Sequence, residues 1–234
     1  MLIEDLYKRL SYGELNNLAL SGDGSGTIVE EARPRIILYA NEALIRLYSA
    51  FVLRTDSVII QLEGHITMYH LLPRFCYSQR NISTEPYLYI ADLDDEPYEN
   101  DLIKILTVFD GDGCELPLND SENSRSVFTP QAQVLQVPWA ESDKHLSLLY
   151  QAKHAVLPDG DPHAIIELPE VLHGALTAFI AYKVYSHMNT AEASNKAAEH
   201  MSVFTSICED ALTKDLVSTS ILPSNTRFHK RGWI

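Results

Sequence analysis

The feature that most constrains the fold is a pair of helical patterns within residues 166–216. Apolar side chains recur in both at intervals of three and four residues, as on one face of an α-helix. In the first they are Leu172, Ala175, Leu176, Phe179, Ile180 and Val184, and in the second Ala197, Met201, Phe204, Cys208, Ala211 and Leu212. Pro169 suits the first turn of a helix, where its missing N–H is not needed. Only Ser186–Thr190 separates the patterns, so the sequence predicts an antiparallel helical hairpin that serves as a packing unit.

The chain is acidic, and its charge limits the partners it can have. Its 234 residues are enough for one large domain or two small ones, and the formal net charge is -14. Such a surface repels DNA and anionic membranes at long range, so tight phosphate binding is not expected, although DNA could still pass by without sticking. Apolar runs are too short for a membrane span, which takes about 18–20 residues. Glu4 and Asp5 stand where a signal peptide carries basic residues, so we expect no export signal.

The cysteines and histidines do not predict a metal or cofactor site. Cys76, Cys114 and Cys208 are far apart and odd in number, which favours free thiols in a reducing compartment. The nine histidines lack the i, i+4 spacing of a helical zinc site. No Gly-x-Ser-x-Gly elbow and no cysteine-protease motif occurs. We therefore expect no cofactor, no metal and no catalytic residue.

The N-terminal part is predicted to contain three helices. Ser11 and Glu14 have the spacing of a capping box, which predicts one short helix before Ser11 and another over residues 12–20. The Gly/Ser-rich residues 21–26 follow as a flexible linker, and without the lysine of a P-loop they are a poor phosphate site. A longer helix is expected over 34–53, with Glu42 and Arg46 as an exposed ion pair. Its predicted inner face consists of Ile37, Ala40, Leu44, Leu47, Tyr48 and Phe51.

The middle of the chain is predicted to form an antiparallel β module. Strand patterns occupy residues 57–62, 66–71, 87–91, 102–109, 126–137 and 146–153. The gap at residues 63–65 has the size of a hairpin turn. Residues 102–109 would also suit a helix, but their alternation and the Asp110–Gly113 turn signal favour a strand and hairpin. A calcium loop starting at Asp110 fails because its twelfth residue is Ser121 and not glutamate.

The fold class expected is therefore α+β, a mainly helical body with an inserted β module and an extended C-terminal arm. We assign residues 1–55 to the N-terminal helices, 56–156 to the β insertion, 157–217 to the helical hairpin and 218–234 to the arm. This arm is basic in an acidic chain, and it carries Trp233 near its end. It is either a frayed terminus or an arm that docks on a partner, with Trp233 as the anchor.

Carboxylates gather at Asp92, Asp94, Asp95 and Glu96. Such a charge run is typical of a solvated loop. The two acids of a glycosidase need not be close in sequence, so a glycosidase pair stays open, although no positive feature supports one.

The order of these signals resembles the head-to-tail adaptor, or connector, proteins of tailed bacteriophages, including the tail gatekeeper proteins of short-tailed phages. The resemblance covers nearly the whole chain and lies in loose structural motifs. They are Leu10–Leu15, the Gly/Ser loop, Pro34–Leu44, Ile105–Asp110, Leu116–Asp120, Phe128–Pro130, Tyr150–Ala152, Ile166–Pro169 and the Arg227–Trp233 tail.

The resemblance implies a non-enzymatic virion protein of the neck, made in the host cytoplasm. Such proteins form a ring of about twelve copies below the portal of the capsid, and DNA passes through without specific binding. The helical body would form the ring wall, the β insertion would project toward the tail or out from the rim, and the C-terminal arm would bind the portal. The tail or nozzle protein would be a further partner. The docking residues implied are Arg227, Phe228, Lys230, Arg231 and Trp233.

Two alternatives from other classes remain. One is a phage tail-associated hydrolase that cuts cell-wall sugar with two of its acids, which requires a cleft and an acid with a raised pKa. The other is a monomeric binding or regulatory module that forms no ring. A ring buries much surface between identical copies, whereas a monomer buries none.

Overall fold

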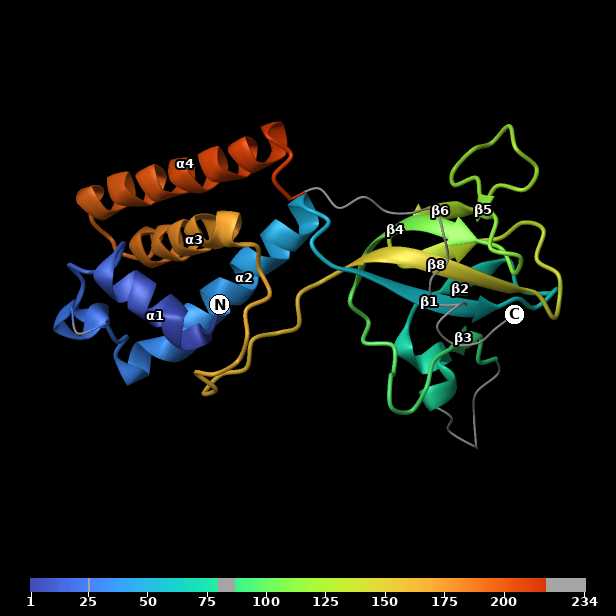
Figure 1. Cartoon of the computed structure of the whole chain (residues 1–234), viewed down its shortest axis with the longest axis horizontal. Helices are drawn as coiled ribbons and strands as arrows, with labels where there is room; N and C mark the ends of the chain where they lie inside the picture. Colours follow the sequence, from blue (N-terminus) through green and yellow to red (C-terminus); the bar gives the residue numbers. More distant parts are fainter. Residues whose placement is uncertain (25, 80–86, 218–234) are drawn as a thin grey trace. The chain divides into compact units, whose positions relative to one another are not determined.

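The chain consists of two compact units (Figure 1). The computed structural model describes residues 1–24, 26–79 and 87–217. Among the described residues, Met1–Leu53 and residues 154–217 form the helical unit, and Arg54–Lys153 belong to the β unit. The α+β class, the C-terminal helical hairpin and the β module are thereby confirmed. The predicted arm, residues 218–234, lies outside the described residues.

The centre of the helical unit is α3 (His173–Ser186), which contacts α1 (Ile3–Tyr12), α2 (Arg33–Ala50) and α4 (Ala191–Thr213). Helix α3 is apolar on nearly all sides, as a helix surrounded by protein must be. Short 3₁₀ turns accompany the helices at Ala19–Gly24, Glu30–Ala32 and Glu170–Leu172.

Helices α3 and α4 form the predicted hairpin, and α4 covers α3 with one face only. The Thr190 hydroxyl accepts a hydrogen bond from the Ala193 N–H and so caps α4. Phe204 is buried against Phe179 of α3. Leu212 was predicted on this inner face but is 58% exposed. The last buried residue of α4 is Ala211, and the exposed side of the helix is mostly polar, with Val203 and Leu212 as exposed apolar side chains.

The predicted break at Ser11 is wrong, because α1 continues through that residue to Tyr12. Ser11 is fully buried and its hydroxyl donates to the Ser21 carbonyl, 2.8 Å away. No α-helix covers residues 13–20, where turns lead into the 3₁₀ turn that begins at Ala19. The hydroxyl that suggested a cap is used instead to hold the following loop.

Helix α2 buries the predicted inner face, but its predicted outer ion pair does not form. Glu42 pairs with Lys183 of α3, with 2.6 Å between the carboxylate oxygen and Nζ. The Arg46 guanidinium lies over the Phe179 ring, 5.1 Å from its centre. Both long side chains reach the neighbouring helix α3. Contacts with this packed surface stabilise the fold more than a solvent-exposed ion pair would.

The β unit contains two antiparallel sheets. In the larger, the strand order is β3 (Ile90–Ala91), β1 (Thr55–Gln61), β8 (His145–Ala152), β4 (Leu102–Phe109), β5 (Glu115–Leu116). The smaller has the order β2 (Met68–His70), β7 (Val134–Gln136), β6 (Phe128–Gln131). Two 3₁₀ turns, Pro73–Phe75 and Tyr77–Gln79, follow β2. Side chains from both sheets share one apolar core that includes Ile60, Tyr69, Leu135 and Leu148.

One predicted hairpin is present and one is not. Strand β4 turns at Asp110 and pairs with β5, and the Asp110 N–H donates to the Cys114 carbonyl. By contrast, β1 and β2 belong to different sheets, so the hairpin expected around residues 63–65 is wrong. After β1 the Leu62 N–H bonds to the Lys144 carbonyl, which keeps the chain beside β8 before it crosses to the smaller sheet.

Candidate functional site

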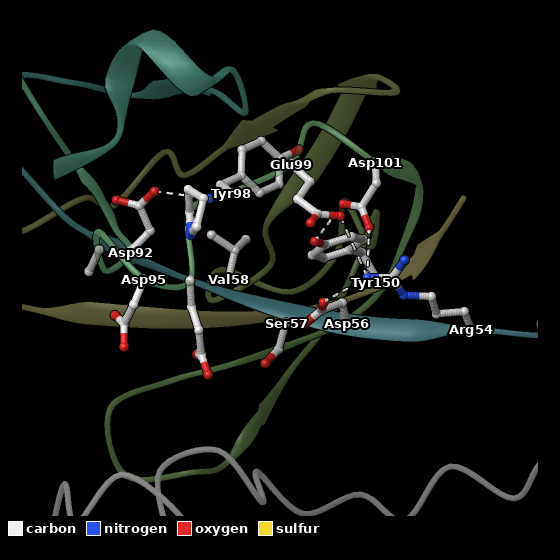
Figure 2. A pocket seen from close by; sticks show the side chains of 13 residues that line it. Arg54, Asp56, Ser57, Val58, Asp92, Asp95, Tyr98, Glu99, Asp101 and Tyr150 are labelled. Atoms are coloured by element: carbon white, nitrogen blue, oxygen red, sulfur yellow. Dashed lines mark hydrogen bonds and ion pairs between the residues drawn. The ribbon is translucent and has the colours of Figure 1, made fainter. Parts of the chain in front are cut away.

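The β unit has an acidic cleft at the beginning of β1, with a cavity of about 340 Å³ (Figure 2). We define the acidic cleft by its ionisable side chains, one cation and six carboxylates. They are Arg54, Asp56, Asp92, Asp95, Glu96, Glu99 and Asp101. Ser57, Val58, Tyr98 and Tyr150 complete its walls. The cleft is thus a cavity with room for more than one long side chain, lined mainly by carboxylates.

Three segments bring these residues together. Asp56 and Ser57 lie near the start of β1, whose first residues are less buried than Val58–Ile60 and so tolerate polar side chains. The loop between β3 and β4 supplies residues 92–101, and β8 supplies Tyr150 beside β1 and β4. Antiparallel pairing of β1 with β8 sets Asp56 opposite Tyr150. The cleft therefore exists only once the large sheet has formed.

Arg54 is the cation of the cleft, and three carboxylates surround it. Its guanidinium lies 3.7 Å from Asp56, 3.8 Å from Glu99 and 3.6 Å from Asp101. The side chain is 30% exposed, so these ion pairs are only partly screened by water. One guanidinium cannot neutralise three carboxylates, so the described side chains of the cleft carry a net negative charge.

Asp101 is the buried member of this group, with 8% of its surface exposed. One carboxylate oxygen accepts a hydrogen bond from the Tyr150 hydroxyl at 2.9 Å. The other, Oδ2, is buried and accepts no hydrogen bond in the structure. Burial and then the Asp101 charge raise the pKa of Tyr150, so its hydroxyl stays protonated and donates. Most buried carboxylate oxygens in proteins find a donor, so Oδ2 is an exception.

Asp92 has a structural role that the predicted solvated loop does not include. Its oxygens accept hydrogen bonds from the Ser78 N–H, the Ser78 hydroxyl and the Tyr98 N–H, at 2.9, 2.6 and 2.9 Å. Burial alone would raise the pKa of this carboxyl, but the hydrogen bonds outweigh burial and lower it below 3.8. Asp94, Asp95 and Glu96 are exposed, as expected for a solvated loop.

The helical unit carries a second surface feature, around Asn41 of α2. The Asn41 amide bonds to Leu157 twice, accepting from its N–H at 2.9 Å and donating to its carbonyl at 3.3 Å. Leu38 and Ile45 lie one turn to either side of Asn41, and Val156 precedes Leu157. These three apolar side chains are 57%, 56% and 82% exposed, and we refer to them as the apolar patch.

The residues predicted to dock on a portal, Arg227 to Trp233, lie outside the described residues. Sequence reasoning missed Arg54, Asp56, Glu99 and Asp101. Their spacing carries no signal, because Arg54 and Asp101 meet only through strand pairing. Among the described residues no group of His, Cys, Asp or Glu side chains is arranged to hold a metal ion.

Cys76 is buried, Cys114 exposed and Cys208 intermediate, and all three are free thiols. In the described part of the chain no helix is long and apolar enough to cross a membrane. Comparison of the sequence with protein-family models and with curated proteins gave no match.

Proposed function

We propose that this chain is a structural head-to-tail adaptor of a tailed bacteriophage. In this proposal about twelve copies form a ring that joins the portal to the tail and continues the DNA channel. The apolar patch of the helical unit carries the proposal. Exposed apolar side chains grouped around a fixed backbone contact are typical of surfaces that another protein covers. A ring needs such a surface on every copy.

The electrostatics of the chain support the same role. A net charge of -14 suits a channel wall along which DNA moves without binding. On α4 the open face carries Glu192, Glu199 and Glu209, all exposed. A face with these carboxylates repels the phosphate groups of DNA.

The C-terminal segment is the portal-docking arm in this proposal. Arg227, Phe228, Lys230, Arg231 and Trp233 combine positive charge with aromatic side chains. Charge steers the approach of two proteins, and a tryptophan supplies an anchor once they meet. Repetition around a ring turns a weak contact into a stable one. The tail or nozzle protein is the partner on the other side.

The acidic cleft does not favour the alternative of a sugar hydrolase. A glycosidase needs an acid whose pKa is raised so that it can donate a proton. The pKa of Asp92 is lowered, and its oxygens are occupied by Ser78 and Tyr98. We therefore propose a role without catalysis.

The test is the mass of the complex, by native mass spectrometry or sedimentation, of the chain alone and mixed with a portal ring. Full-length protein and a form ending at Pro223 are compared. We expect the full-length protein to join the portal in ring stoichiometry and the shortened form to fail. If both forms join, the adaptor role stands without the arm. If full-length protein does not associate at low or moderate salt, the adaptor role is wrong.

Two double variants test the apolar patch in the same experiment. Leu38→Glu with Ile45→Glu introduces charge into the patch, and we expect it to prevent ring formation on the portal. Val203→Glu with Leu212→Glu is the matched control, because these side chains are 44% and 58% exposed on α4. Equal loss in both double variants would mean that the apolar patch is not the ring contact.

A further inference from the structure

The described lining of the acidic cleft has more carboxylates than cations, and one of its buried carboxylate oxygens accepts no hydrogen bond. Asp101 Oδ2 is buried and accepts no hydrogen bond, and the nearest cation, Arg54, lies 3.6 Å away at ion-pair distance. Asp95 lies on the side of the cavity away from Arg54 and Asp101 (Figure 2), and both Asp95 and Glu96 are exposed lining residues. Buried oxygens without donors are costly, and a ligand that supplies an N–H would remove the cost.

The ligand that fits is a cationic side chain with several N–H donors. A guanidinium presents five N–H groups in a plane and pairs with carboxylates through two parallel hydrogen bonds. The cavity of about 340 Å³ accommodates such a side chain. A bare metal ion is less suitable, since the described carboxylates do not form a set of three ligands.

The chain itself contains a segment with this chemistry. Residues 218–234 include Arg227, Lys230 and Arg231 and no aspartate or glutamate, in a protein whose net charge is -14. We infer that the acidic cleft binds the C-terminal segment of a second copy, with the guanidinium of Arg227 or Arg231 beside Asp101. Charge complementarity carries this inference: the segment is basic where the rest of the chain is acidic, and the cleft concentrates the opposite charge.

This contact goes beyond portal docking and competes with it. The same arginines cannot occupy the acidic cleft of another copy and a groove on the portal at once. Copies in free solution would therefore associate through the cleft and the segment, and a portal would displace that contact. The inference does not require the adaptor role, because it concerns two copies of this chain alone.

The experiment uses full-length protein, followed by sedimentation velocity over a range of concentrations at low salt. A fluorescent peptide of residues 221–234 is titrated in parallel and followed by anisotropy. We expect saturable peptide binding and concentration-dependent self-association. Both should weaken as salt is raised, because the ion pairs at the mouth of the cleft are partly exposed.

Two triple variants isolate the cleft. Asp95→Asn, Glu96→Gln and Glu99→Gln remove three charges from its exposed rim, and we expect peptide binding to weaken about tenfold or more. Glu192→Gln, Glu199→Gln and Glu209→Gln remove the same charge from α4, and binding should stay within about twofold. Asp101→Asn is a further single variant that reports on the buried oxygen. Near-ultraviolet circular dichroism verifies that each variant is folded.

A mixing experiment distinguishes a second copy from the chain's own segment. The rim variant keeps a basic segment but has a weakened cleft, whereas Arg227→Gln, Lys230→Gln and Arg231→Gln leave the cleft intact without the charges. Neither should self-associate alone, and their mixture should associate. Association of the wild type with none in the mixture would contradict exchange between copies.

Three further results would overturn the inference. They are an absence of peptide binding at low salt, equal weakening by the two triple variants, and binding of calcium alone at the cleft. Equal weakening would mean that overall charge attracts the peptide. None of these results depends on the portal, so the adaptor proposal would be unaffected by them.

Discussion

The Thr177 hydroxyl donates a hydrogen bond to the Glu14 carboxylate over 2.7 Å, although 163 residues separate the two in the chain. Thr177 is buried in α3 and Glu14 lies in the turn after α1. Tyr185, two turns further along α3, donates to the Glu14 carbonyl. Both groups of Glu14 are thus bound to the central helix, which fixes the first turn of the chain against it.

Replacing Thr177 by valine should destabilise the helical unit by about 1–2 kcal/mol. Valine keeps the shape of the side chain but leaves the Glu14 carboxylate without its donor. Urea unfolding followed by circular dichroism at 222 nm measures the change. Thr205→Val is the control, because the Thr205 hydroxyl bonds only to the Met201 carbonyl on the exposed face of α4. Similar losses in both variants would show that the Glu14 contact contributes little.

Replacing Asn41 by alanine should free the segment around Leu157 from α2. The side chain satisfies both the N–H and the carbonyl of Leu157, and about 1–3 kcal/mol should be lost with them. We expect faster cleavage by limited proteolysis between His154 and Pro162, detected by mass spectrometry. Ser49→Ala serves as control, since the Ser49 hydroxyl bonds only within α2. Unchanged cleavage in Asn41→Ala would contradict this role.

His173 should make the helical unit less stable in mild acid. Burial lowers the pKa of His173 below 6.5, and the charges of Arg9 and the chain's amino group act in the same direction. The unfolded chain then takes up a proton before the folded chain does. The stability contribution is complete above about pH 6.5 and falls as the pH drops below it. His173→Gln should flatten the unfolding free energy between pH 7 and 5, whereas exposed His163→Gln should leave its slope unchanged.

Asp92 should matter to the β unit far more than its neighbour Asp94. Asp92→Asn weakens acceptance from Ser78 and Tyr98, and we expect a loss of about 1–3 kcal/mol, while Asp94→Asn should change stability little. Because its pKa is lowered, the ionised Asp92 contributes fully above about pH 3.8, and this contribution is lost as the pH falls further. Unfolding of both variants at pH 7 and pH 3 gives the comparison. A difference that is the same at both pH values would contradict it.

The three cysteines should react in an order set by their exposure. Cys114 is exposed in the β4–β5 turn, whereas burial raises the pKa of Cys76 to about 12. We expect a thiol reagent at pH 8 to label Cys114 first, Cys208 more slowly and Cys76 only on unfolding. Mass spectrometry of tryptic peptides identifies the labelled residue. Fast labelling of Cys76 in folded protein would mean that the core of the β unit opens readily.

The sequence predicted those helices, strands and turns that depend on residues close together in the chain. The hairpin of α3 and α4 follows from the three- and four-residue spacing around Phe179 and Phe204. Strand β4 and its turn at Asp110 follow from alternation and a turn signal that lie within a few residues of each other. Even the inner face of α2 was predictable, since helical spacing places Leu44, Leu47 and Tyr48 on one side of the helix.

The contact partners of individual side chains could not be predicted from the sequence. Hydrophobic periodicity identifies the buried face of a helix or strand but not the segment that packs against it. Ser11 and Glu14 have the spacing of a cap, yet Ser21 and Thr177 bind them, and Glu42 pairs with Lys183 on another helix. Likewise, pairing of β1 with β8, not the neighbouring β2, joins segments that lie far apart in the sequence.

The acidic cleft is the clearest case of a feature decided by tertiary structure. In the sequence Arg54, Asp101 and Tyr150 are ordinary residues of three separate segments. Antiparallel pairing of β1, β8 and β4 brings them together and removes Asp101 from water. The sequence by itself determined the elements and the acidic charge of the chain. Only the fold decided where that charge is concentrated, because burial and ion pairing depend on contacts between segments distant in sequence.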